Sequence, residues 1–165
     1  MIKAITNSEL LLRNKIVKLA LLQHRKLYKH GMHGPDDFDC AGFVWYVYNE
    51  VLGIDIYKDG IGLSSTTWIM TSPIGILNTF EEDDLDKDLS VIHKGDILLF
   101  HKQSKEDNEP KVDNKYPGHC GIYLGDNRFI HASSKRGHVA INNFEKTEYW
   151  VKKLVGSKDM ISNHF

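Results

Sequence analysis

Apolar residues recur with a helical period in the first third of the chain. After Ser8, the expected N-cap, one face of a first helix carries Leu12, Ile16, Leu19 and Ala20. A polar loop containing glycine follows, and Asp39 is then expected to cap a second helix that ends at Gly53. The apolar stripe of this second helix consists of Phe43, Val44, Val47 and Val51. A short third helix is expected over residues 64–70.

The pattern changes to short apolar runs in the second half, which predicts strands. Residues 97–100 form a buried run after the turn at 94–96, and residues 119–124 and 128–132 flank Gly125-Asp126-Asn127, a strong hairpin signal. Further strands are expected at 139–141 and 150–155, and the polar stretch 102–117 is expected to be an excursion loop. Helices followed by an antiparallel meander of about five strands indicate an α+β fold.

Composition restricts the classes of function. The 165 residues, 41% of them hydrophobic, suit a single domain over 1–165. A net charge of −1 with dispersed basic residues gives no basic surface for nucleic acid, and the acidic run at 81–88 is expected to be a solvated loop. Neither a membrane span nor a Sec signal is apparent, because the apolar run at 10–12 is broken at once by Arg13. We therefore expect synthesis in the cytoplasm and no membrane insertion.

The two cysteines differ in their predicted chemical surroundings. Cys40 follows the Asp39 cap, where helix N–H groups and the helix dipole favour a thiolate; the alternative is a cysteine that merely packs in the core. A thiolate nucleophile needs a base, and that base needs a third group to orient it. His119 and His131 fall at near-diagonal positions on the two strands of the hairpin, close enough to hydrogen-bond. Cys120 must then point to the opposite face of the sheet, toward the core.

Four segments carry further patterns: residues 38–44 read F-D-C-A-G-F-V, 95–100 G-D-I-L-L-F, 118–125 G-H-C-G-I-Y-L-G and 129–132 F-I-H-A. In the same order, they resemble the motifs F-D-C-S-G-[LF]-V, G-D-L-[LV]-F-F, H-[VC]-G-I-Y-L-G and F-I-H-A of the NlpC-type cell-wall peptidases, a papain-like family. Tyr28 lies twelve residues before Cys40, where that family has the tyrosine of Y-x-W-G-G. The likeness covers residues 28–150 and implies the papain-like fold, with a catalytic cysteine at a helix N-terminus.

The resemblance also implies an activity, the hydrolysis of peptidoglycan stem peptides, typically between D-glutamate and a diamino acid. It implies Cys40 as nucleophile, His119 as general base and His131 as the orienting residue, with no cofactor and no metal. It further suggests that the Tyr28 hydroxyl and the Cys40 N–H line an oxyanion hole. Two departures concern the substrate: Ala41 replaces the usual serine, and the W-G-G portion is altered at residues 30 and 32. Asp39 could attract a substrate amine, but the cap is its expected role.

Alternatives remain open from the sequence alone. Cys40, His119 and His131 could instead hold zinc, the fold could transfer an acyl group to an acceptor other than water, or the domain could bind without catalysis. A wall hydrolase without a Sec signal would need another export route, as an injected effector with a cognate immunity protein or as a phage lysin. A recycling enzyme in the cytoplasm would need none.

Overall fold

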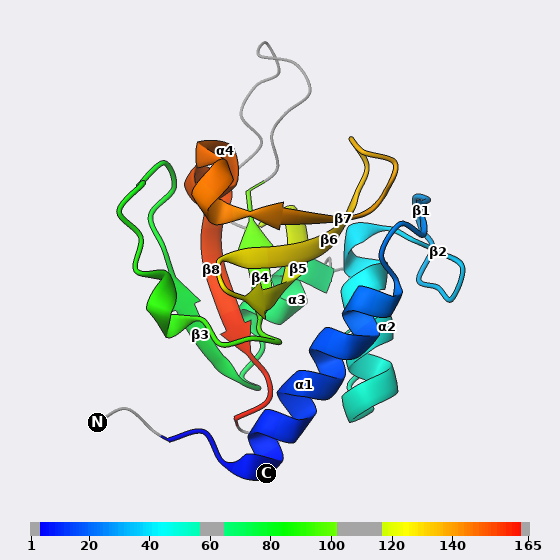
Figure 1. Ribbon diagram of the computed structural model, residues 1–165, viewed down its shortest axis with the longest axis horizontal. Coiled ribbons are helices and arrows are strands. Elements are labelled where there is room, and N and C mark those ends of the chain that lie inside the picture. Colours follow the sequence, from blue (N-terminus) through cyan, green and yellow to red (C-terminus); the bar gives the residue numbers. More distant parts are fainter. Residues whose placement is uncertain (1–3, 57–64, 102–116, 163–165) are drawn as a thin grey trace.

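The computed structural model describes residues 4–56, 65–101 and 117–162, and in this part of the chain two helices pack against a curled sheet (Figure 1). Helix α1 (Asn7–Leu22) contacts α2 (Cys40–Leu52), which covers one face of the sheet, and α3 (Ser65–Thr71) follows. The expected α+β architecture is therefore confirmed. None of the described helices is long and apolar enough to span a membrane. Most of the predicted excursion loop at 102–117 lies outside the described residues.

Helix ends follow the local chemistry of their caps. Asp39 caps α2 and the left-handed Gly53 ends it, both as predicted. Helix α1 begins earlier than predicted: Thr6, and not Ser8, is its N-cap, and the Thr6 hydroxyl accepts a hydrogen bond from Glu9 N at 3.1 Å. Both positions carry a hydroxyl, so propensity alone did not distinguish them.

Over the described residues, the sheet has eight strands in the order β2-β1-β7-β6-β5-β4-β8-β3, which is more than the five predicted. Its strands are β1 (Leu27–Tyr28), β2 (Asp37–Phe38), β3 (Ile76–Thr79), β4 (Ile97–Phe100), β5 (His119–Gly125), β6 (Arg128–Ser133), β7 (His138–Asn143) and β8 (Leu154–Asp159). All pairs are antiparallel except β1 with β2, which is parallel. The additional strands are too short or too exposed to show a period of two.

One predicted strand was wrong in its first part. Residues 150–155 were expected to form a strand, but α4 (Glu148–Lys153) occupies most of that range and β8 begins only at Leu154. Trp150 and the valines there look strand-like, yet Trp150 packs from a helical turn onto Phe100 and Phe129, so tertiary contact overrides the local pattern.

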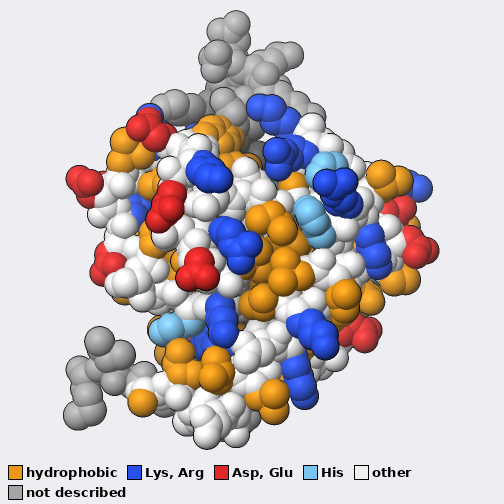
Figure 2. Space-filling view, viewed as in Figure 1, with side chains coloured by type: hydrophobic (Ala, Val, Ile, Leu, Met, Phe, Trp, Pro, Cys, Tyr) orange, Lys and Arg blue, Asp and Glu red, His pale blue; other side chains and the backbone are white. Residues whose placement is uncertain are grey.

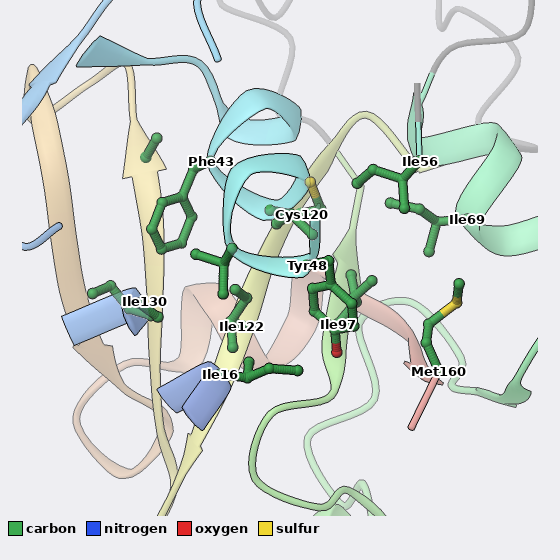
Figure 3. Packing of buried hydrophobic residues seen from close by; sticks show 14 of the residues in the cluster. Ile16, Phe43, Tyr48, Ile56, Ile69, Ile97, Cys120, Ile122, Ile130 and Met160 are labelled. Atoms are coloured by element: carbon green, nitrogen blue, oxygen red, sulfur yellow. The ribbon is translucent and has the colours of Figure 1, made fainter. Parts of the chain in front are cut away.

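Apolar side chains cover both faces of the central strands. On the helical side, residues of α1, α2 and α3 form one cluster with alternate residues of β4, β5 and β6, and Figure 3 shows Phe43 and Tyr48 of α2 beside Ile97, Cys120 and Ile122. On the other side, a second cluster contains Leu98, Phe100, Phe129, Phe144 and Leu154. Because both faces are covered, β4 is buried along its whole length, and the catalytic candidates can be fixed from two sides.

Candidate active site

Cys40 is the first residue of α2, and Asp39 holds the backbone around it. The two carboxylate oxygens of Asp39 accept hydrogen bonds from Gly42 N at 2.6 Å and from Gly31 N at 3.0 Å. The first bond caps the helix and the second ties the preceding loop to it. The Cys40 thiol therefore lies at the positive end of the helix dipole.

The loop before Cys40 packs very closely on the first turn of α2. The Asp39 N–H donates to the Met32 carbonyl at 2.8 Å, and a Cβ atom at Gly42 would lie only 2.2 Å from that same oxygen. Residue 42 must therefore be glycine for the loop to keep its place beside the cysteine. This contact gives a physical reason for the glycine that follows Cys40 and Ala41.

The two histidines meet through the register of the hairpin. Strands β5 and β6 pair Ile122 with Ile130, and this register leaves His119 and His131 diagonal to each other on one face. Their rings are joined by a contact of 2.8 Å between His119 Nε2 and His131 Nδ1, so the predicted diagonal geometry is confirmed. Asp126 and Asn127 both have positive φ, as a two-residue hairpin turn requires.

Asn142 on β7 extends this pair and determines which ring nitrogens carry protons. Its side-chain oxygen lies 2.8 Å from His131 Nε2, so that nitrogen donates and His131 Nδ1 is left as an acceptor. His119 Nε2 must then donate to His131, which leaves His119 Nδ1 with its lone pair free to take a proton. Sequence reasoning missed Asn142, although it lies on β7 just after the predicted strand and two positions from Ala140, the partner of His131.

Burial keeps His131 neutral. Its side chain is 1% exposed and packs on Phe129 and Trp150, with ring centroids 5.0 and 4.9 Å away. Burial first, and then the charge of His119, lower the pKa of His131 to about 3. A neutral His131 can accept the His119 hydrogen bond throughout the physiological range, which suits an orienting group.

The surroundings of Cys40 favour the thiolate. A hydrogen bond with the Cys120 thiol and a hydrogen bond with His119, together with the His119 charge, lower the pKa of Cys40 well below its usual value, although burial opposes the shift. Cys120 has the opposite behaviour: its contact with Cys40 and its complete burial raise its pKa well above the usual value. Cys120 belongs to the core cluster on the helical face, as predicted.

The two remaining predicted residues differ in what they offer. Burial raises the pKa of Tyr28, and the charges of Cys40 and Asp39 raise it further, so its phenol stays protonated as a donor beside the thiol. Ala41 packs against the core cluster and brings no polar atom. The structure thus gathers Cys40, His119, His131 and Tyr28, whereas Asp39 acts on the backbone.

This geometry differs from that of a metal site. The chain of contacts runs from Cys40 to His119, then to His131 and Asn142, whereas zinc requires its ligands to converge on one point. Within the described residues, the group whose ligand atoms do converge is His93, Asp96 and Asp159, and Arg13 already occupies the two carboxylates there.

The difference between the two thiols predicts their relative reactivity. We expect iodoacetamide to alkylate Cys40 at least about tenfold faster than Cys120 at pH 7, because the thiolate is the reactive form and Cys120 is completely buried. Peptide mass spectrometry after timed quenching measures both rates in one sample. Equal rates, or faster labelling of Cys120, would contradict the described electrostatics.

Comparison with known proteins places the chain in a family. The NlpC/P60 family model matches residues 25–159, and the chain belongs to the NlpC/P60 family. It is 29% identical over 132 residues to the probable peptidoglycan endopeptidase LytE and 28% identical over 132 residues to gamma-DL-glutamyl hydrolase, both from Bacillus subtilis; each match covers 79% of this chain. It spans only 29% and 26% of the lengths of these two relatives.

Solved structures agree with the family. The structure of NlpC2 from Trichomonas vaginalis superimposes with a TM-score of 0.61 at 25% identity, over 91% of this chain and 47% of that one. The fold, with its helix carrying the cysteine and its curled sheet, is therefore that of NlpC/P60 domains.

Proposed function

We propose that this chain is a cysteine peptidase that hydrolyses an amide bond in peptidoglycan stem peptides, between D-glutamate and a diamino acid. The observation that carries the proposal is the placement of Cys40 at the start of α2 beside His119, whose ring is hydrogen-bonded to His131 and, through it, to Asn142. Membership of the NlpC/P60 family supports the peptidoglycan substrate, as does the name of the relative LytE. The name of gamma-DL-glutamyl hydrolase supports a bond on the side-chain carboxyl of glutamate.

The reaction proceeds through a thioester in this proposal. The Cys40 thiolate attacks the amide carbonyl, and the oxyanion that forms is stabilised by the Cys40 N–H and the Tyr28 hydroxyl. His119 passes the proton on its Nδ1 to the leaving amine, and the C–N bond breaks. His119 then takes a proton from water, which attacks the thioester and releases the carboxylic acid and the Cys40 thiolate.

His131 and Asn142 support this cycle without contacting the reacting atoms. When His119 is doubly protonated, its Nε2–H still donates to the neutral His131, so the ring keeps its orientation while its charge changes. Asn142 holds His131 in the tautomer that can accept this bond.

A digestion experiment tests the proposal. Purified peptidoglycan is incubated with the protein, and new termini are identified by mass spectrometry. We expect new D-glutamyl carboxyl groups and new amino groups on the diamino acid. New termini at another bond would contradict the assigned specificity, and an absence of new termini would contradict the assigned activity.

Asn142 provides a test of the tautomer argument. We expect Asn142→Leu to lower kcat by about tenfold with little change in KM, because His131 loses the acceptor that fixes its protons. Asn142→Asp is the matched control: it keeps an acceptor at the same place and should retain most of kcat. Equal kcat values for the two variants, measured on a soluble muropeptide, would contradict this role.

The alanine at position 41 leads to a prediction about the substrate, namely whether stem peptides attached to glycan or free peptides are preferred. Without the family serine, no hydroxyl is offered here to a free N-terminal amine of the stem peptide. We therefore expect kcat/KM on stem peptides still attached to glycan to equal or exceed that on free tripeptide. Ala41→Ser should raise kcat/KM on the free peptide by about tenfold, the value of one hydrogen bond to a charged group. A strong preference of the wild type for free peptide would contradict this and favour a cytoplasmic recycling role.

A further inference from the structure

The two cysteines of this chain lie against each other although eighty positions separate them. Cys120 Sγ donates to the Cys40 carbonyl oxygen at 3.4 Å, and the two side chains also interact with each other. Figure 3 shows the Cys120 sulfur directed at α2, the helix that begins with Cys40. No disulfide joins them, and the sequence contains no other cysteine.

The hydrolytic mechanism uses only one of these thiols. Cys120 is on the strand that carries His119 but points to the opposite face, so it takes no part in moving protons to the substrate. It occupies a completely buried core position, where its packing alone does not require a thiol. A buried thiol in contact with a nucleophilic thiol can nevertheless form a disulfide with it when the nucleophilic thiol is oxidised.

The two thiols are unequal in exposure and in charge. Cys40 is half-buried and its environment favours the thiolate, the form that hydroperoxides oxidise, whereas Cys120 is completely buried and stays protonated. A peroxide from solvent would therefore meet Cys40 first. The oxidised sulfur would form within reach of the second thiol, before any other partner could reach it.

We propose that Cys40 and Cys120 form a reversible disulfide in the presence of hydroperoxides, with Cys40 as the oxidised thiol and Cys120 as the resolving thiol. The Cys40 thiolate attacks the O–O bond of the peroxide, giving a sulfenic acid and releasing alkoxide, or hydroxide from hydrogen peroxide. The Cys120 sulfur then attacks the sulfenic sulfur; the S–O bond breaks, the S–S bond forms, and the Cys120 proton leaves with the hydroxyl as water. The sulfurs lose two electrons and the peroxide gains them.

This disulfide would have two consequences. It removes the nucleophile, so hydrolysis stops until a dithiol reduces the bond; this part rests on the proposed function. It also keeps Cys40 from further oxidation to a sulfinic acid, which thiols do not reverse. The pair would then act as a protective switch on the catalytic sulfur.

The experiment uses the full chain, reduced and freed of reductant, then treated with a small molar excess of hydrogen peroxide and quenched with N-ethylmaleimide. We expect the treated protein to take up no maleimide, while the untreated, unfolded protein takes up two. Peptide mapping should find the 40–120 crosslink, with the protein still monomeric on a non-reducing gel. Activity on peptidoglycan should be lost on treatment and return to its untreated rate with dithiothreitol.

Variants at position 120 separate the resolving role from a packing role. In Cys120→Ala, and in Cys120→Val as a second variant that fills the core, peroxide should leave a sulfinic acid on Cys40. The activity lost by these variants, each compared with its own untreated rate, should not return with dithiothreitol. Equal recovery in the variants and the wild type would overturn the proposal.

The mass measurement tests the disulfide, and the activity measurement tests its effect on hydrolysis, so each can contradict its own part of the proposal. A sulfinic Cys40 beside a free Cys120 in the treated wild type would overturn the disulfide, whatever the protein hydrolyses. A crosslink that forms without any loss of rate would overturn the switch and also the assignment of Cys40 as nucleophile. A crosslink in a protein that cleaves no peptidoglycan before treatment would overturn the proposed function and leave the disulfide standing.

Discussion

We expect Cys40→Ala to lower the rate of peptidoglycan hydrolysis by about 10⁴-fold or more, the largest effect of any single substitution in this chain. In the proposed mechanism the Cys40 thiolate forms the covalent bond to the substrate, and no described side chain beside it can replace that step. Alanine keeps the helical start of α2 and the Asp39 cap, which depend on backbone and carboxylate groups. The release of new amino groups from purified peptidoglycan measures the residual rate.

Two controls distinguish a loss of chemistry from a loss of folding and from a metal-dependent activity. The circular dichroism spectrum and melting temperature of Cys40→Ala should match those of the wild type within a few degrees, so that lost activity reports chemistry. Wild-type activity should be lost on alkylation by iodoacetamide and should withstand a metal chelator. Activity that survives Cys40→Ala but is lost to the chelator would contradict the thioester mechanism and favour a zinc-dependent hydrolase.

The largest effect on stability is expected at Arg13, which is completely buried between two carboxylates. Its guanidinium donates to Asp96 Oδ1 at 2.8 Å and to Asp159 Oδ2 at 2.9 Å, and so joins α1 to the start of β4 and the end of β8. Removing one partner of a buried ion pair leaves an uncompensated charge. We therefore expect Arg13→Ala to lower the free energy of unfolding by about 3–5 kcal/mol.

The size of this loss should depend on pH. Burial first, and then the charge of Asp159, raise the pKa of Asp96 to about 7. Because this pKa exceeds the unfolded value, the folded state binds the proton more tightly, and Asp96 costs stability as pH rises from about 4 to 7. Arg13 offsets that cost only where Asp96 is charged, so Arg13→Ala should lose more stability at pH 8 than at pH 5.

Urea unfolding at both values of pH measures the effect. Lys15→Ala is the matched control, since Lys15 is exposed on the same helix and should change stability by less than about 0.5 kcal/mol. A loss below about 1 kcal/mol for Arg13→Ala at pH 8 would contradict the importance of this network.

Features that depend on neighbouring residues in the chain could be predicted from the sequence. The Asp39 cap, the Gly53 end of α2 and the 125–127 turn each result from a local backbone requirement that few residue types satisfy. The diagonal placement of His119 and His131 was predicted from a hairpin loop of two or three residues, and the structure reaches it through a one-residue register shift between Tyr123 and Gly125 that puts both histidines on one face. The Asp39 cap also gave Cys40 its predicted place at a helix N-terminus.

Other features depend on which elements pack together, and they appeared only in the tertiary structure. Asn142 reaches His131 because β7 pairs with β6 in one register, and the predicted strand ended one residue too early to include it. Trp150 lies beside both histidines because packing on Phe100 and Phe129 makes a helical turn of a segment that reads as a strand.

The partners of Arg13 and Cys120 also depend on which elements pack together, and for this reason they could not be predicted from the sequence. A buried arginine is stable only if carboxylates approach it, and Asp96 and Asp159 do so from positions 83 and 146 residues away. Cys120 touches Cys40 because α2 lies on the face of β5 opposite to His119, a docking of helix on sheet that neither segment encodes alone. The sequence thus determined the capped helix start at Cys40 and the hairpin that carries His119 and His131, while the packing of α2, β7 and α4 decided which side chains surround them.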